Sequence, residues 1–172
     1  MEYKNDKNKV ALAGGPDSLE NKIRLRKEAC CADIHAKALR ALDGDAAAAG
    51  RVLDALRRDR FVDDLRYASS FAREKSRLTG WGPLKIRHAL TAKGIAAEVL
   101  DEALRQVDPE ETERRMRQVL AGKSRQLARD PARKEKLLRF ARSRGYLYGQ
   151  VSPLLEELLG DGGAREREED YI

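Results

Sequence analysis

Apolar residues recur three and four positions apart along most of the chain, which is the spacing of one face of an α-helix. Val99, Leu100, Ala103 and Leu104 show this spacing within one stretch. Glycine, proline and aspartate interrupt the pattern at short intervals, as expected where helices end and begin. We predict helices at residues 18–28, 31–42, 45–59, 64–78, 83–93, 96–107, 109–129, 131–145 and 150–159.

The predicted helices fall into three groups of three, and two pairs of segments resemble each other. "VLDAL" at 52–56 is similar to "VLDEAL" at 99–104. "ALRRDRFV" at 55–62 is similar to "FARSRGYL" at 140–147. Units of roughly 40 to 50 residues are typical of helical repeats. We predict a flexible leader, three three-helix repeats and an acidic tail at residues 1–16, 17–60, 61–107, 108–160 and 161–172.

The second pair of segments places an aromatic residue after a basic turn, Phe61 in one copy and Tyr146 in the other. We interpret this pattern as a recurring joint between repeats, in which the aromatic side chain fills the gap between neighbouring helices. The alternative is chance similarity in a helical sequence of low diversity.

Residues 61–107 contain the clearest helix boundaries. Asp63 suits the N-cap of the helix at 64–78, because its carboxylate can accept a bond from a free backbone N–H. Pro83 suits the first turn of the next helix, and Gly94 suits its end. The apolar residues expected on the inner sides of these helices are Tyr67, Phe71, Leu78, Ile86 and Leu90.

Composition limits the fold class, and the charge distribution suggests a partner. Ala, Leu, Arg and Glu dominate and aromatic residues make up 5% of the chain, so we expect an all-α protein with several small cores. The net charge is +6. Residues 51–93 hold 11 basic and 5 acidic side chains, residues 111–150 hold 12 and 4, and residues 156–170 hold 2 and 7. This distribution favours a polyanionic partner, and the alternative is an arginine-rich solvated surface.

No enzyme active site or cofactor site is predicted. "GKS" at 122–124 lacks the glycine five residues earlier, and the preceding strand, that a phosphate loop needs. Asp63 and Asp64 fit helix caps better than catalytic carboxylates, because no second acid or histidine lies at a set distance. His88 follows Arg87 on a basic helix and is interpreted as a surface residue.

The sequence also favours neither a metal site nor a membrane location. His35 and His88 do not complete a zinc-ligand set, and the adjacent Cys30 and Cys31 are interpreted as small buried or half-buried thiols. The chain has no apolar run typical of a signal peptide or membrane span, so we expect a reduced, cytoplasmic protein. Trp81, between two glycines, fits a core position better than a base-stacking one.

Residues 51–107 combine several short motifs: "FVDD", Tyr67-Ala68 and Phe71, then "GWGP", "KIR", Leu90 and "KGI". In this order and spacing they resemble the RecX family, the regulatory proteins of the RecA recombinase. "RGYLYGQV" at 144–151 is similar to the later repeat of that family, and "CCADIHAKAL" at 30–39 to its first. The motif residues are Phe61, Asp63, Asp64, Tyr67, Phe71, Trp81, Gly82, Pro83, Ile86, Leu90, Gly94, Gly145 and Tyr146.

The resemblance implies three tandem three-helix repeats in an elongated, curved molecule. It also implies binding in the groove of the RecA–DNA filament, inhibition of RecA's ATPase and strand exchange, and some affinity for DNA. Two positions depart from the family. Arg60 stands where the family often has glycine, so a left-handed turn is less expected there than at Gly145. Ala89 stands where the family often has glutamate, so any salt bridge of that glutamate is absent.

We therefore predict a monomeric regulator of RecA in recombinational DNA repair and the SOS response, without a cofactor. It would contact the filament and single- or double-stranded DNA through basic faces. The residues chosen for these contacts are Arg66, Arg73, Arg77, Lys85, Arg87, Lys93, Arg114, Arg117, Arg139 and Arg142. The main alternative is a stand-alone DNA- or RNA-binding protein of helix-turn-helix type, which predicts sequence preference and a dimer. A helical-repeat adaptor whose charge only keeps it soluble is a further alternative.

Overall fold

The computed structural model describes residues 29–165, and within that range it contains eight α-helices, one π-helical turn and no strand. This confirms the all-α fold class. The elements are α3 (Cys31–Ala41), α4 (Ala46–Arg58), α5 (Asp64–Glu74), the π-turn η1 (Lys75–Thr79), α6 (Pro83–Thr91), α7 (Ala97–Arg105), α8 (Pro109–Gln126), α9 (Arg133–Ser143) and α10 (Tyr148–Arg165). The predicted leader, the predicted helix at 18–28 and residues 166–172 of the predicted tail lie outside the described residues, whereas residues 161–165 of that tail continue α10.

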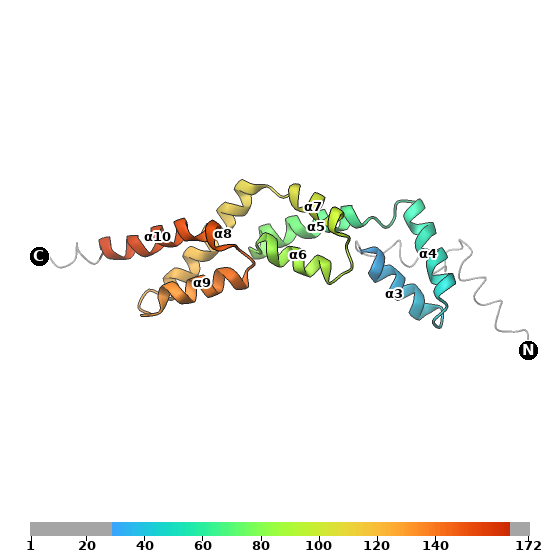
Figure 1. The fold of residues 1–172 in the computed structure, drawn as a ribbon, viewed down its shortest axis with the longest axis horizontal. Coiled ribbons are helices and arrows are strands. Elements are labelled where there is room, and N and C mark those ends of the chain that lie inside the picture. Colours follow the sequence, from blue (N-terminus) through green and yellow to red (C-terminus); the bar gives the residue numbers. More distant parts are fainter. Residues whose placement is uncertain (1–28, 166–172) are drawn as a thin grey trace, which may run out of the picture.

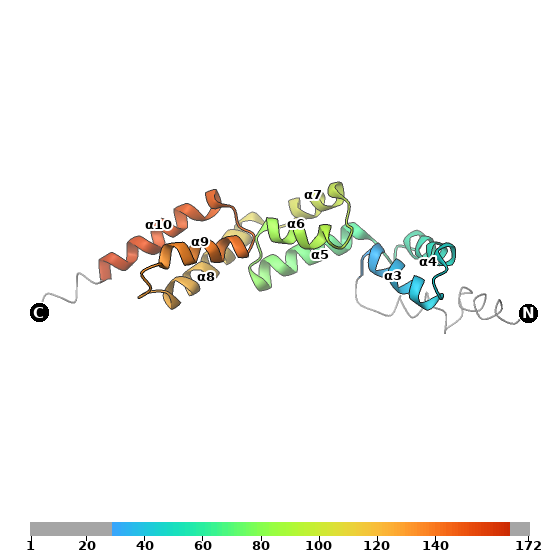
Figure 2. The same ribbon diagram turned by 60° about the horizontal axis from the view of Figure 1, so that its bottom comes forward.

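The helices form three units that follow one another in a row (Figure 1). The first unit contains α3 and α4, the second contains α5, η1, α6 and α7, and the third contains α8, α9 and α10. Figure 2 shows the same row after rotation about its long axis, so the molecule is elongated in both views.

Each unit has its own apolar core, as the small number of large apolar residues predicts. The first core contains Ile34, Ala38, Leu42, Val52 and Leu56. The second contains Ala68, Ala72, Ile86, Leu90 and Leu100. The third contains Leu120, Leu137, Tyr146, Val151 and Leu155. Cys30, directly before α3, is buried in the second core rather than the first, so the first two units meet at this residue.

The local boundary signals are confirmed where the sequence states them most clearly. The Asp63 carboxylate accepts a hydrogen bond from the backbone N–H of Arg66 at 2.9 Å and caps α5. Pro83 occupies the first turn of α6. Gly94 follows the end of α6 with a φ of +74°, a left-handed conformation that suits glycine.

The end of α5 differs from the prediction of a continuous α-helix to residue 78. The chain instead continues as the π-turn η1, and Thr79 donates its hydroxyl to the carbonyl of Lys75 at 2.6 Å. A π-turn contains an additional residue, which rotates the following side chains by roughly 100° relative to an α-helix. Ser76 is buried four residues after the buried Ala72, as in a continuous α-helix, whereas Leu78, predicted to face inward, is 56% exposed.

The two similar turns after α4 and α9 share one local structure. Arg60 and Gly145 both adopt left-handed backbone, with φ of 58° and 85°. The next N–H, of Phe61 or Tyr146, donates to the carbonyl five residues earlier, at 2.9 and 3.1 Å. This is the hydrogen-bond pattern of a Schellman helix end. Arg60 therefore takes the left-handed conformation although it is not glycine.

The interpretation of this turn as a recurring joint between repeats was wrong. The turn at Phe61 connects the first unit to the second, whereas the turn at Tyr146 lies inside the third unit, between α9 and α10. Tyr146 is 3% exposed and fills a gap, but Phe61 is 47% exposed. Val62, the next residue, occupies the first core in its place. The counterpart of Tyr146 in the second unit is Ile95, which follows the left-handed Gly94. Ile95 is also buried, and its N–H donates to the carbonyl of Leu90, five residues earlier.

Candidate interaction site

The second and third units interlock through their backbones at a contact that we call the second joint. The N–H of Gly82 donates to the carbonyl of Arg144 at 2.7 Å, and the N–H of Leu84 donates to that of Gly145 at 3.2 Å. The Tyr146 hydroxyl donates to the carbonyl of Gly80 at 3.2 Å. The "GWGP" and "RGY" motifs, 61 or more residues apart in the sequence, therefore lie against each other.

Glycine is required on both sides of this joint. A Cβ on Gly82 would lie 2.5 Å from the carbonyl oxygen of Gly145. A Cβ on Gly145 would lie 2.3 Å from the backbone nitrogen of Lys85. Both distances are shorter than any van der Waals contact, and backbone atoms cannot move aside as a flexible side chain can. The second joint is therefore fixed by close approach of backbone.

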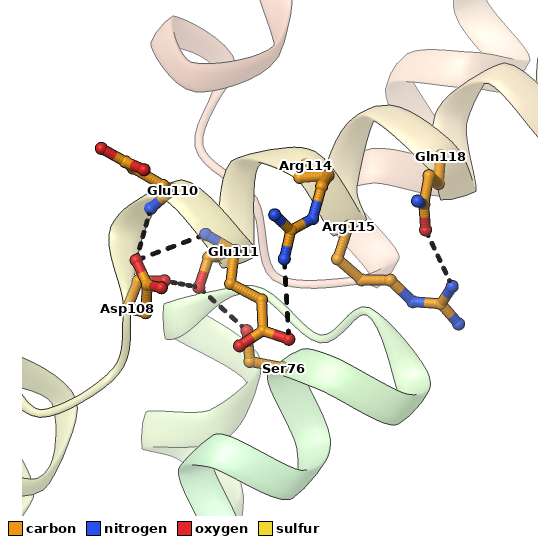
Figure 3. A network of polar contacts seen from close by, with 8 residues as sticks. Ser76, Asp108, Glu110, Glu111, Arg114, Arg115 and Gln118 are labelled. Atoms are coloured by element: carbon orange, nitrogen blue, oxygen red, sulfur yellow. Dashed lines mark hydrogen bonds and ion pairs between the residues drawn. The ribbon is translucent and has the colours of Figure 1, made fainter.

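A polar network reinforces the second joint at the start of α8 (Figure 3). Asp108 caps α8 by accepting from the N–H of Glu110 at 2.9 Å, and its carbonyl accepts from the Thr112 hydroxyl at 2.8 Å. The Thr112 hydroxyl also lies 3.0 Å from the buried hydroxyl of Ser76 in η1. The network thus positions the first turn of α8 against the π-turn.

The first and second units meet through side chains, at a contact that we call the first joint. The Asp64 carboxylate accepts from the backbone N–H of Cys31 at 2.8 Å, at the first turn of α3. Lys93 forms an ion pair with Asp33 at 2.8 Å. Asp63 and Asp64 therefore both bind helix N-termini, as the capping interpretation predicts, but they serve two different helices.

The ionisable groups of the first joint are shifted by their contacts. The hydrogen bond from Lys93 lowers the pKa of Asp33, and the same bond raises the pKa of Lys93. Burial raises the pKa of the Cys30 thiol, and burial together with the Asp64 carboxylate raises that of Cys31 to about 11. Both thiols are therefore protonated at neutral pH, as expected of structural cysteines.

A row of half-buried aromatic rings crosses the second unit. The ring centroids of Tyr67 and Phe71 lie 6.1 Å apart, and those of Phe71 and Trp81 lie 6.2 Å apart. All three rings pack against the second core, so Trp81 occupies the core position that the sequence favours. The Lys85 ammonium lies 4.8 Å from the Trp81 centroid, and it also donates to the carbonyl of Ser143 in the third unit.

Six of the ten basic residues chosen from the sequence bind other groups of the protein. Arg66 donates to the carbonyls of Arg60 and Phe61 and so holds the left-handed turn. Lys85 and Lys93 connect neighbouring units, as described above. Ion pairs engage the remaining three, with Asp101 for Arg87, Glu111 for Arg114, and Glu113 and Glu157 for Arg117.

The other four chosen residues are exposed arginines: Arg73, Arg77, Arg139 and Arg142. Among the described residues, none of the four has a hydrogen-bond or ion-pair partner. Arg73 and Arg77 line a cleft of about 540 Å³ between η1 and the start of α8, which we call the mixed cleft. Its walls also contain the carboxylates of Glu74, Asp108 and Glu111.

A second charged hollow, which we call the basic pocket, contains none of the ten binding residues that were predicted from the sequence. It has a volume of about 340 Å³ and lies between α8 and α9, with Arg115, Lys123 and Arg144 in its lining. Arg115, Gln118, Gly122 and Gln126 follow each other at spacings of three and four, so a polar stripe on α8 was the available signal.

Metal ligands and membrane spans are not found in the described part of the chain. No three His, Cys, Asp or Glu side chains between residues 29 and 165 gather in a way that would hold a metal ion. In the same range, each helix is too short or too polar to cross a bilayer.

Comparison with known proteins finds similarity to one family. The family model for the second three-helix domain of RecX matches residues 63–104, which are α5 to α7. The chain is 32% identical over 117 residues to the regulatory protein RecX of Clostridium tetani, covering 66% of this chain and 53% of the relative. It is 32% identical over 104 residues to that of Salmonella arizonae, covering 60% and 62%. The chain thus spans about half the length of the curated relatives it matches.

Two solved structures share the fold. A crystal structure of regulatory protein RecX has a TM-score of 0.74 at 23% identity and covers 87% of this chain and 71% of its own. RecX from Lactobacillus salivarius has a TM-score of 0.73 at 18% identity and covers 89% and 97%. The motifs of the second unit and the sequence relatives agree, and the chain is similar to the RecX family of regulatory proteins in sequence and to RecX structures in fold.

Proposed function

We propose that this protein binds the RecA–DNA filament and inhibits the ATPase and strand-exchange activities of RecA, so that it limits recombinational DNA repair. Similarity to the RecX family supports this role, and the names of the curated relatives describe regulation rather than catalysis. The observation that carries the proposal is the set of exposed, unpaired arginines on two successive units of an elongated body. Such a body can follow a filament and present its cations at several points.

The two charged hollows would face different components of the filament. A DNA strand carries only negative charge, so the carboxylates in the mixed cleft repel it. A protein surface can carry both signs of charge and so can match both walls of that cleft. We therefore assign Arg73 and Arg77 to contact with the RecA protein and not with DNA.

The first test is the ATPase rate of RecA filaments on single-stranded DNA, titrated with this protein. We expect the rate to fall at sub-stoichiometric concentrations, because one bound molecule affects several RecA subunits along the filament. An unchanged rate contradicts the proposal. Salt-sensitive DNA binding together with that result would favour the stand-alone nucleic-acid-binding protein.

A double charge reversal tests the assignment of the mixed cleft. Arg73→Glu with Arg77→Glu should raise the half-inhibitory concentration by about tenfold, since two attractive charge contacts become repulsive. Arg51→Glu with Arg58→Glu removes the same charge from exposed positions of the first unit and serves as the control. Helical content should remain unchanged in both proteins, and equal inhibition by both would remove Arg73 and Arg77 from the interface.

A further inference from the structure

The basic pocket differs from the mixed cleft in the sign of its lining. Every ionisable side chain that lines it is a cation, namely Arg115, Lys123 and Arg144. The remaining polar lining consists of the amides of Gln118 and Gln126, and the floor includes the ring of Phe140. No carboxylate belongs to this lining, so its positive charge is not opposed from within.

The internal partners of these three cations are neutral groups. Arg115 donates to the carbonyl of Leu78 at 3.0 Å and to the amide oxygen of Gln118 at 3.2 Å. Arg144 donates to the carbonyl of Thr79 at 2.6 Å. Carbonyl and amide oxygens orient a cation but leave its net charge in place. Three positive charges therefore remain in the pocket, unlike those of Arg87 and Arg117, which carboxylates compensate.

The same contacts hold the cations in position before any ligand binds. Arg115 and Arg144 are fixed by the carbonyls of two consecutive residues at the end of η1. The Arg144 guanidinium and the Lys123 ammonium lie 5.0 and 5.8 Å from the centroid of the Phe140 ring. Side chains that are already ordered lose less conformational entropy when they bind an anion.

One donor of the Arg115 guanidinium has no acceptor. The Nε of Arg115 is buried and makes no hydrogen bond within the described structure. A buried guanidinium nitrogen without a partner is unfavourable, because its hydration is lost without compensation. An anion seated beside Arg115 would supply acceptors to the guanidinium group.

We propose that the basic pocket binds a phosphate group of a nucleic-acid strand. Guanidinium and ammonium groups together are typical phosphate ligands, and guanidinium can bind two oxygens at once. The pocket is widely open to solvent, so a strand can enter and leave on either side of the bound phosphate. This inference rests on the proposed function only for the biological source of the strand, and it places the DNA contact on the third unit.

The test is the affinity for a fluorescein-labelled single-stranded DNA 20-mer, measured by anisotropy between low and moderate salt. Lys123→Gln should weaken binding by about five- to tenfold and reduce the slope of log affinity against log salt by about 1. Arg125→Gln removes one charge from the same helix outside the pocket and should leave both quantities almost unchanged. Within residues 29–165 the Lys123 ammonium forms a hydrogen bond only with the Gln126 side chain, so the variant should fold, which circular dichroism checks.

The outcomes separate this inference from the proposed function. Equal losses in the two variants overturn the phosphate pocket, and no DNA binding by the wild-type protein overturns a nucleic-acid strand as its ligand. The other possible ligand is free phosphate, which is tested by adding inorganic phosphate at matched ionic strength and measuring the melting temperature. If phosphate raises the melting temperature of the wild-type protein but not of Lys123→Gln, and DNA does not bind, the ligand of the pocket is free phosphate and not a nucleic-acid strand. RecA ATPase inhibition is measured separately, and its failure does not alter a Lys123-dependent DNA affinity.

Discussion

The two joints between units depend on different kinds of contact. At the second joint, backbone N–H groups bond to backbone carbonyls, and Gly82 and Gly145 leave no space for a side chain. At the first joint, the carboxylates of Asp64 and Asp33 bind α3 and Lys93. Backbone contacts do not depend on pH or on a rotamer, whereas side-chain contacts depend on both.

Because the two joints differ, the three units need not behave as one rigid rod. The second and third units should move together, because close backbone packing tolerates little displacement. The first unit is attached by polar side-chain contacts and by the burial of Cys30 in the second core. Separating these contacts should cost less free energy than separating the backbone contacts of the second joint. We expect the first unit to open and close locally more often than the rest of the described chain.

Among the variants at the two joints, Gly145→Ala should have the largest effect on stability. The added Cβ collides with the backbone of Lys85, and alanine disfavours the φ of +85°. We expect the free energy of unfolding to fall by about 2–4 kcal/mol, measured by urea denaturation. Gly149→Ala is the matched control, because no atom lies within 4 Å of its added Cβ and the residue is helical. Equal stability of the two variants would show that the second joint is not tightly closed.

An intermediate effect is expected from Asp64→Ala at the first joint. The variant removes the carboxylate that accepts from Cys31 at the start of α3, which should cost about 1 kcal/mol. Hydrogen exchange should accelerate in α3 and leave α8 and α9 unchanged. Asp63→Ala, which removes the cap of α5, is the comparison and should accelerate exchange in the second unit. Faster exchange in the third unit of the Asp64 variant would contradict the independence of the two joints.

The smallest effect concerns the Lys93–Asp33 ion pair and its pH dependence. The folded-state pKa of Asp33 is lowered, so the pair stabilises the protein above the unfolded pKa near 4 and this contribution is lost as pH falls through the folded pKa. The pKa of Lys93 is raised, so its contribution is lost only as pH rises above about 10.5.

Asp33→Asn should therefore destabilise the protein by about 0.2–1 kcal/mol at pH 7, a small effect because both groups are partly exposed. The effect should be smaller at pH 3, because Asp33 of the wild-type protein begins to be protonated as pH falls. Thermal unfolding at the two pH values measures the difference. Asp54→Asn, at an exposed position of the first unit, controls for the change in net charge. A constant difference between pH 7 and pH 3 would show that the ion pair does not contribute.

The helices and their ends could be predicted because their signals are local. Asp63, Pro83 and Gly94 each satisfy a requirement of the adjacent backbone, and the structure places all three as expected. The exposure of Leu78 was not predictable from periodicity, because the π-turn adds a residue without a sequence marker. The exposure of Phe61 depends on Val62 reaching the first core, which is a tertiary contact.

The candidate site was predictable in charge but not in pairing. A basic side chain looks the same in a sequence whether it faces solvent, as Arg73 does, or bonds to a carbonyl, as Arg66 does. Lys85 and Lys93 bind partners 58 and 60 residues away, beyond the reach of any helical spacing. Only the fold separates the cations that hold the molecule together from those that remain for a partner.

The cap of α3 also has a consequence for the order in which the protein is made. Asp64 lies 33 positions after Cys31, and Lys93 lies 60 positions after Asp33. Because synthesis begins at the N-terminus, α3 emerges from the ribosome before its capping residue and its ion-pair partner have emerged. The first unit therefore reaches its final structure only when the second unit has emerged, and a ribosome that pauses between them would expose an unfinished α3 to proteases.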